Sequence, residues 1–341
     1  MKQKVALITG ITGQDGGYLA KLLLEKGYRV IGLFRRGATD TFCKLKAHGI
    51  YDQIEFEPFE LLEFSNIVNI IKKYQPDEFY NLAAQSFVGA SWNEPIYTMQ
   101  SNGMGVLYIL EAIREFSPHT KFYQASTSEM FGKVRAIPQD ETTPFYPRSP
   151  YGIAKLAAHW LTVNYRESFN LFACSGILFN HESPMRGEEF VTKKISNHIA
   201  RLSLGLTNIP LELGNLNSKR DWGYAGDYVY GMWLMLQQNK ADTYVLATGE
   251  THTIRDFVET VSKFVNIDIE WVGEGINEIG IDKNTNRTIV KVNEKYFRPA
   301  EIDLLIGNPS KAFSVMNWKR KVSYEELCKM MIEYDLRLNT K

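Results

Sequence analysis

The amino-acid sequence predicts an α/β protein in which a doubly wound parallel sheet carries a smaller second lobe. The first observation is the apolar run Val5–Ile8, which leads into glycines at three-residue spacing and then into an apolar-periodic helix. The second is a regular alternation of strand-like and helix-like segments, typical of a parallel sheet with helices on both faces. The third is that this alternation stops beyond about residue 180. We therefore expect the second half to be a lobe wrapped onto the first.

The bulk composition argues against several classes of protein. The 341 residues include 39 Lys and Arg and 39 Asp and Glu, so the net charge indicates neither a nucleic acid nor an anionic membrane as partner. No apolar run approaches the roughly 18 residues of a membrane span, and the N-terminal residues do not follow a signal-peptide pattern. Three widely spaced cysteines, Cys43, Cys174 and Cys328, suggest a reducing compartment and no disulfide framework or zinc site. We expect a cytoplasmic protein without a bound metal.

The glycine turn at Gly10, Gly13 and Gly16 is a candidate nucleotide site. A strand that enters such a turn and leaves as a helix aims backbone N–H groups at a ligand from a positive helix end, which suits a pyrophosphate. The glycines let the backbone approach the phosphates and let the helix pack closely on the strand. The spacing is GxxGxxG rather than GxGxxG, and an ordinary strand-to-helix loop is the alternative interpretation.

The end of the second strand bears on the choice of cofactor. Arg29–Phe34 has a strand pattern, and Arg35 and Arg36 follow it where many NAD-binding chains carry an acid for the ribose hydroxyls. Two guanidinium groups suit a 2′-phosphate, so NADP is favoured over NAD, the alternative being a solvated arginine pair. After the short strand Gln53–Glu57, Glu60 could accept a hydrogen bond from the adenine amino group or could begin a helix.

The remaining first half continues the alternation. Small residues after a strand, as at Ala83 and Ala84, would let a cofactor lie against the backbone. The predicted strands are Glu78–Leu82, Lys121–Ala125 and Leu171–Leu178, and the predicted helices are Asp15–Lys26, a helix capped by Ser65 that runs to Lys73, one from Pro95 to about Phe116, and Tyr151–Phe169.

The second half shows a weaker pattern. A strand at Thr243–Ala247 is expected to return to the first sheet, whereas Gly273–Asn293 is poorly patterned. The predicted helices are Ile195–Leu204, Asp227–Gln238, a helix capped by Thr253 that ends at Phe264, and one capped by Ser323 that ends at Leu338. We accordingly divide the chain into a dinucleotide-binding domain, 1–178, and a mainly substrate-binding lobe, 179–341.

Tyr151 and Lys155 form a candidate redox pair. They lie four residues apart on one predicted helix and so share a face. A nearby ammonium group favours the phenolate, which allows a tyrosine to exchange a proton with a sugar hydroxyl while hydride moves to a nicotinamide. The alternative is a surface helix pair. With the glycine turn and Ser126-Thr127 upstream, the pattern resembles the extended short-chain dehydrogenase/reductase family, which implies a Rossmann-type sheet.

Glu129 follows Thr127 by two residues and suggests the subclass. Oxidising C4 of a hexose to a ketone acidifies the C5 proton, and a base that removes it lets the C6 hydroxyl leave. One carboxylic group can serve both proton steps if its pKa is tuned. The bland alternative is a helix-capping glutamate. An epimerase or reductase of the same superfamily would not need Glu129, and a nucleotide-sensing module would commonly lack Tyr151 or Lys155.

Longer motifs resemble the GDP-mannose 4,6-dehydratase family over nearly the whole chain. The matching stretches are Gln124–Gly132, Thr142–Tyr151, Gly176–Pro184, Arg186–Glu188, Phe190–Thr192, Lys219–Gly223 and Tyr296–Glu301.

The resemblance implies roles residue by residue. The catalytic residues would be Thr127, Glu129, Tyr151 and Lys155. The GDP-sugar would be held by Ser86, Asn180, Glu189, Lys193, Arg220, Arg298 and Glu301. The cofactor would be held by Tyr151 and Lys155 together with Gly10, Thr12, Gly13, Gln14, Asp15, Gly16, Arg35, Arg36, Glu60, Leu61, Leu82, Ala83, Ala84, Ser86, Tyr97, His181 and Arg186.

Several positions depart from the family pattern. The loop after Arg36 is shorter, and in the family that loop joins subunits around the cofactor, so both a homodimer and a homotetramer remain open. Phe87 stands for a usual histidine near the expected sugar site, which leaves GDP-mannose and GDP-manno-heptose as alternative substrates. Met185 and Lys193 each replace an arginine, and Glu60 replaces an aspartate.

Overall fold

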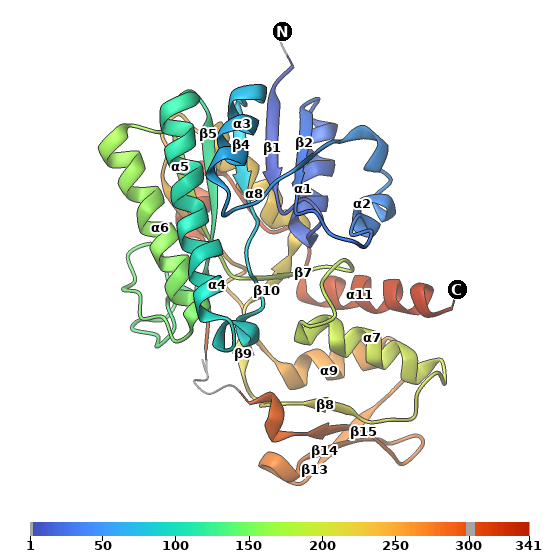
Figure 1. Ribbon diagram of the computed structural model, residues 1–341. Coiled ribbons are helices and arrows are strands. Elements are labelled where there is room, and N and C mark those ends of the chain that lie inside the picture. The colour runs from blue at the N-terminus through green and yellow to red at the C-terminus, as the bar shows by residue number, and fades with distance from the viewer. Residues whose placement is uncertain (1–2, 298–303, 341) are drawn as a thin grey trace.

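A seven-stranded parallel sheet forms the centre of the larger lobe (Figure 1). The computed structural model describes residues 3–297 and 304–340. In the strand order β11-β6-β5-β4-β1-β2-β3, β1 lies inside the sheet. The strands β2 and β3 are added on one side of β1, and the later strands on its other side. Its strands are β1 (Val5–Thr9), β2 (Arg29–Phe34), β3 (Glu55–Pro58), β4 (Glu78–Asn81), β5 (Lys121–Thr127), β6 (Ala173–Leu178) and β11 (Thr243–Leu246).

Alternating side chains of each strand enter two different cores. On β1, Ala6 and Ile8 pack with one set of helices, whereas Val5 and Leu7 pack with the other. The first set is α1 (Gln14–Glu25), α2 (Cys43–Ala47), α8 (Ala225–Gln237) and α10 (Ser310–Met316). The second set is α3 (Phe64–Tyr74), α5 (Gly105–Phe116) and α6 (Pro150–Phe169), and α4 (Pro95–Met99) packs beside α6. The prediction of a doubly wound parallel sheet is confirmed.

The smaller lobe has its own core below the carboxyl edge of this sheet. Its helices are α7 (Val191–Ser203), α9 (Ile254–Lys263) and α11 (Tyr324–Asn339). They pack against a four-stranded sheet of order β13-β14-β15-β8, whose strands are β13 (Ile269–Val272), β14 (Ile279–Asp282), β15 (Arg287–Val292) and β8 (Leu211–Leu213). Figure 1 shows this lobe beneath the ends of the central strands.

Two short ladders connect the lobes. β7 (Asn180–Glu182) pairs in parallel with β10 (Trp222–Tyr224), and β9 (Lys219–Arg220) pairs antiparallel with β12 (His252–Thr253). The chain also returns twice to the larger lobe, through α8 and β11 and again through α10. The described residues beyond position 178 therefore contribute to both lobes.

Some local predictions need correction. Ser65 does not cap α3: the N-cap is Glu63, whose carboxylate accepts from Ser65 N at 3.3 Å. The helix expected from Pro95 to Phe116 is divided, because a π-helical turn at Gln100–Met104 separates α4 from α5. β14 and β15 lie in the stretch judged poorly patterned. None of the helices within 3–297 and 304–340 is long and apolar enough to span a lipid bilayer.

Candidate active site

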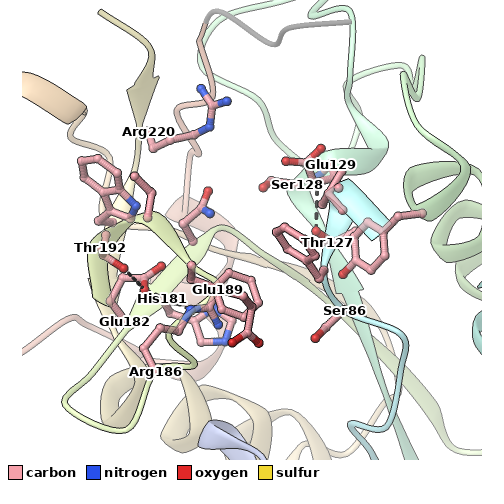
Figure 2. A pocket seen from close by; sticks show the side chains of 18 of the residues that line it. Ser86, Thr127, Ser128, Glu129, His181, Glu182, Arg186, Glu189, Thr192 and Arg220 are labelled. Atoms are coloured by element: carbon pink, nitrogen blue, oxygen red, sulfur yellow. Dashed lines mark hydrogen bonds and ion pairs between the residues drawn. The ribbon is translucent and has the colours of Figure 1, made fainter. Parts of the chain in front are cut away.

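A cavity of about 590 Å³ lies where the carboxyl ends of the central strands meet the smaller lobe. Figure 2 shows Thr127 and Glu129 on one wall, with Arg220, Thr192 and His181 on the opposite wall. The predicted site residues that line this cavity are Asp15, Leu82, Ala84, Ser86, Thr127, Glu129, Tyr151, Lys155, Asn180, His181, Arg186, Glu189 and Arg220. The structure therefore brings all four predicted catalytic residues together.

Two adjacent elements position the catalytic side chains. Thr127 ends β5 and caps a short 3-10 turn, Ser128–Met130, by accepting from Glu129 N at 3.2 Å. The N-cap of α6 is Ser149, which accepts from Gly152 N at 3.0 Å and so fixes the helix start just before Tyr151. Lys155 lies one turn further along the same helix.

Burial dominates the electrostatics of Tyr151 and Lys155. Burial raises the pKa of Tyr151 above its usual value, and a side-chain hydrogen bond with Thr127 lowers it in part. Burial also lowers the pKa of Lys155 to about 8. The Lys155 Nζ donates to Ala125 O at 2.9 Å and lies 5.9 Å from the centre of the Tyr151 ring. Both groups are therefore destabilised in their charged forms: the Lys155 pKa moves towards neutral pH, whereas the Tyr151 pKa moves away from it.

Glu129 places a carboxylate beside this pair. It is 8% exposed, and it lies on the same wall of the cavity as Thr127 (Figure 2). The 3-10 turn that follows β5 directs it there, because the turn begins immediately after the strand. An acid, a hydroxyl and a phenol–ammonium pair thus share one water-restricted wall, an arrangement suited to proton transfer.

The glycine turn fits a pyrophosphate. Gly10 has a φ of +68°, and a Cβ there would lie 3.0 Å from Ala83 N. A Cβ at Gly16 would lie 2.4 Å from Gly10 O, so only glycine allows the helix this close to the strand. The N-cap of α1 is Gly13, which offers no side chain to the first backbone N–H groups. Those groups remain directed outward, as an anion site requires.

An ion pair connects this turn to β7. His181 Nε2 lies 2.8 Å from Asp15 Oδ2, and His181 Nδ1 lies 2.8 Å from Phe179 O. Because a carbonyl oxygen only accepts, Nδ1 carries a proton, and Nε2 must carry another to donate to the carboxylate. Burial raises the pKa of Asp15, but the charge and hydrogen bond of His181 outweigh it and lower that pKa to about 2. Burial lowers the pKa of His181, and Asp15 reverses this to a net increase. We interpret His181 as an imidazolium.

The other predicted cofactor residues lie outside the cavity lining. Gln14 donates to His181 O and accepts from Ser183 Oγ, which strengthens the link between α1 and β7. Arg35 Nη1 donates to Tyr97 OH at 2.9 Å. Glu60 lies four residues before α3 begins, so it does not start that helix. The full set outside the lining is Gly10, Thr12, Gly13, Gln14, Gly16, Arg35, Arg36, Glu60, Leu61, Ala83 and Tyr97.

Lys193 requires a correction. It was expected to hold the substrate, but its side chain is 4% exposed, forms an ion pair with Asp335 and donates to Pro184 O at 2.9 Å. Its neighbour Lys194 lines the cavity instead, with Nζ donating to Glu212 O at 2.6 Å and lying 3.6 Å from the centre of the Tyr296 ring. Adjacent helical residues point about 100° apart, which explains why only one of the two lysines can face the cavity.

The backbone beside Arg220 is fixed by the next residue, Asp221. The buried Asp221 carboxylate accepts from Thr248 N, Thr248 Oγ1, Gly249 N and Gly307 N at 2.7–3.2 Å. Burial raises the Asp221 pKa to about 6, and these four donors limit the rise. This fixes the backbone next to Arg220. Two further predicted substrate residues, Arg298 and Glu301, lie outside the described residues.

An aromatic wall completes the cavity. Phe87 contacts Phe190 edge to face at a centroid distance of 6.3 Å, and the Arg186 guanidinium lies 3.6 Å from the centre of the Phe190 ring. Trp92 also lines the cavity. Phe190 and Trp92 were not among the predicted site residues, because aromatic side chains in a sequence more often indicate a core than a binding surface.

Comparisons with known proteins show the family of the chain. The family model described as GDP-mannose 4,6 dehydratase matches residues 7–331. A GDP-mannose 4,6 dehydratase from Dictyostelium discoideum is 49% identical over 344 residues, covering 98% of this chain and 96% of the relative.

Solved structures confirm the fold. A dTDP-glucose 4,6-dehydratase from Bacillus anthracis, in complex with NAD, has a TM-score of 0.81 at 18% identity, covering 99% of this chain and 98% of that one. RMD from Pseudomonas aeruginosa, complexed with NADPH, has a TM-score of 0.76 at 20% identity, covering 98% of this chain and 100% of that one. The family-model match over residues 7–331 and the relative that is 49% identical across 98% of this chain show that the chain belongs to the GDP-mannose 4,6-dehydratase family.

Proposed function

We propose that this protein is a GDP-sugar 4,6-dehydratase, a hydro-lyase that converts GDP-mannose to its 4-keto-6-deoxy product. The observation that carries the proposal is the position of Glu129, a carboxylate on the same cavity wall as Thr127. Oxidation at C4 would need only a hydroxyl, a phenol and an ammonium. Loss of water across C5 and C6 needs an additional base to remove the C5 proton. The carboxylate of Glu129 is the group on the catalytic wall that could act as this base.

The cofactor is NADP, and the glycine turn at Gly10, Gly13 and Gly16 would hold it. When bound, its nicotinamide supplies a hydride acceptor for C4 and returns the same hydride to C6. The open N-terminus of α1 would hold the pyrophosphate. Arg35 and Arg36 are exposed at the end of β2, where guanidinium groups can bind a 2′-phosphate.

The side chains would then move protons in a closed cycle. Thr127 would donate a hydrogen bond to the C4 oxygen while Tyr151, as phenolate, takes the C4 hydroxyl proton. The resulting ketone acidifies C5, and Glu129 would remove the C5 proton and give it to the departing C6 hydroxyl, releasing water. Tyr151 would return its proton to C5 as C6 is reduced. Lys155 lowers the cost of the phenolate, so each residue ends in its starting state.

The diphosphate would be bound at the opposite wall. Arg220 lies there, across the cavity from Glu129 (Figure 2), and Lys194 is another cation of the lining. Asn180 and Ser86 also line the cavity and could bind the sugar. Phe87 and Phe190 form an apolar surface near these groups, and we infer that this surface decides whether GDP-manno-heptose is also accepted.

The substrate and reaction can be tested together. Purified protein loaded with NADP would be incubated in separate reactions with GDP-mannose and GDP-manno-heptose, in deuterated water. We expect a 4-keto-6-deoxy product, one deuterium at C5, and no accumulation of reduced cofactor at 340 nm. Stoichiometric cofactor reduction would contradict internal hydride return, and product from the heptose alone would reassign the substrate.

Glu129→Gln separates dehydration from simple redox chemistry. The amide keeps the size but cannot take a proton, so we expect turnover to fall by at least about 10³-fold while substrate binding is retained. Glu188→Gln is the matched control, because Glu188 is an exposed acid that does not line the main cavity. Full activity of Glu129→Gln would favour an epimerase or reductase.

We further propose that the protein is a homodimer. Ile96 and Met99 on α4 and Ile153 and Trp160 on α6 expose apolar side chains, with Ile96 73% and Trp160 54% exposed. α4 packs beside α6, and both lie on one flank of the sheet (Figure 1). Two copies of this helical face could cover each other.

Light scattering should give twice the chain mass of 39.1 kDa for the unmodified protein. Trp160→Glu should reduce the measured mass to that of one chain, whereas Phe313→Glu on α10 should leave it at twice the chain mass.

The compartment we propose is the reducing cytoplasm. Cys43 is an exposed free thiol, while Cys174 and Cys328 are buried and unpaired. Labelling of the thiols in intact cells would test this.

A further inference from the structure

A buried ion pair joins the C-terminal helix to the rim of the cavity. Lys193 on α7 pairs with Asp335 on α11, and their side chains are 4% and 0% exposed. The second carboxylate oxygen of Asp335 accepts from Ser196 Oγ at 2.6 Å. A buried pair of this kind seldom adds net stability over apolar side chains of similar volume, because both charges are desolvated.

Lys193 makes a second contact that reaches the cavity. Its Nζ also donates to Pro184 O at 2.9 Å. Pro184 belongs to the segment 183–190, whose side chains at Arg186 and Glu189 line the cavity. Lys193 therefore connects the carboxylate of α11 to the backbone of a segment that contributes to the site.

The same residue constrains Lys194. α7 begins at Val191, and the Lys194 backbone N–H donates to Phe190 O at 2.9 Å, so Lys193 and Lys194 lie in the first helical turn. With the Lys193 side chain fixed against α11, the rotation of that turn is fixed, and Lys194 is directed to the cavity. α11 packs along α7 (Figure 1), and Asn339 Nδ2 donates to Asn197 Oδ1 at 2.9 Å further along the same contact.

We propose that Lys193 and Asp335 are positioning residues for the diphosphate end of the substrate. Neither touches the substrate. Lys193 fixes the segment 183–190 through Pro184 O and fixes the first turn of α7, so that Arg186 and Lys194 are held at the cavity before substrate arrives. This inference rests on the proposed function, because it assigns the binding of a nucleoside diphosphate to the Lys194 side of the cavity.

The test uses GDP as the probe and separates positioning from stability. In Lys193→Met, Asp335 loses its partner, so this variant alone could simply unfold. In the double variant Lys193→Met/Asp335→Leu, the buried charges are replaced by apolar side chains, and the thermal midpoint should stay close to that of the unmodified protein. The contact to Pro184 O is still absent. We expect calorimetry to give a GDP dissociation constant about tenfold higher in the double variant.

Steady-state kinetics provide an independent measurement. The KM for GDP-mannose should rise by about the same factor, with kcat changed less than about twofold, because the catalytic wall is untouched. Glu333→Gln is the matched control: it removes an acid from the same helix, where Glu333 pairs with Lys329 at the surface, and it should leave GDP binding unchanged.

Unaltered GDP binding in a stably folded double variant would overturn the inference and leave the ion pair with a structural role only. If the unmodified protein bound GDP but formed no dehydrated sugar, the proposed function would fail while the positioning role could still be measured.

Discussion

Lys155 illustrates how catalysis and stability conflict at a single residue. Burial lowers its pKa from 10.5 to about 8, so the protonated amine carries a penalty in the folded state of roughly 3 kcal/mol. The folded pKa lies below the unfolded one, so the penalty is complete below about pH 8 and is relieved as the pH rises to 10.5.

Lys155→Met should therefore make the cofactor-free protein more stable at pH 7 while inactivating it. We expect a gain of about 2 kcal/mol, because the loss of the hydrogen bond to Ala125 O offsets part of the relief. Activity should fall by at least about 10²-fold. Urea unfolding from pH 7 to 10.5 would check this, with the exposed Lys329→Met as control. An advantage that grew with rising pH would contradict the assignment.

Residues on strand ends and at motif centres could be predicted from the sequence, because their chemistry and spacing are specific. Thr127, Glu129, Tyr151 and Lys155 form one wall as expected. The sequence could not show in the same way that Lys194, rather than Lys193, lines the cavity. Two adjacent lysines differ only in helical phase, and the phase is set by α11, which is 142 residues away in the sequence at Asp335.

At the scale of elements, the π-helical turn between α4 and α5 has a specific anchoring role. Asn102 in this turn is 1% exposed; its Oδ1 accepts from Gln85 N at 2.8 Å and its Nδ2 donates to Gln85 O at 2.9 Å. These two bonds attach the helix to the loop after β4, which carries Ser86 and Phe87 into the cavity. The turn thus positions a part of the cavity lining.

Asn102→Ala should destabilise the protein by about 2 kcal/mol, because two backbone groups of Gln85 lose their partner. We also expect a higher KM with little change in the unfolding m-value, since the loop would loosen without any change in the overall fold. Denaturant titration and initial rates would measure both effects. Asn164→Ala, at an exposed position on α6, should change stability by less than about 0.5 kcal/mol.

Element prediction succeeded where burial gives a strong apolar pattern. β2 begins and ends as predicted, because the apolar run Val30–Phe34 follows the exposed Arg29 and lies inside a parallel sheet. β14 and β15 were missed because they lie in a mixed sheet that is only partly buried, and their polar residues weaken the strand pattern. β7 and β10 have three residues each and form only through pairing with each other.

At the scale of the molecule, the chain does not divide cleanly at residue 178. α8 covers one face of the large sheet with Tyr228, Met232 and Met235, and β11 pairs with β6. Both segments come from the second half of the chain. The polar contacts of the large sheet also depend on the second half of the chain, because Gln237 on α8 donates to the buried Glu78 carboxylate at 3.1 Å.

A fragment of residues 1–178 should therefore fail to fold cooperatively. Without α8 and β11, it would expose the apolar face of the sheet and leave β6 as an unpaired edge. We expect helical circular dichroism without a sharp thermal transition, together with strong binding of a hydrophobic dye. A fragment extended to residue 247 restores both elements and serves as the comparison. A sharp transition in the shorter fragment would show that the domain boundary is real.

The position of α11 has a practical consequence for anyone purifying this enzyme. Its last turn contacts α7 through Asn339 and Asn197, one turn beyond the Lys193–Asp335 pair, and the helix ends at the outer margin of the molecule in Figure 1. β1 begins at the opposite edge of the large sheet. An affinity tag or fluorescent fusion appended after α11 would be attached to the helix that carries Asp335, so Michaelis constants measured with such a fusion should be compared with those of the untagged protein. The same appendage placed before β1 would be attached at the edge of the sheet opposite the cavity.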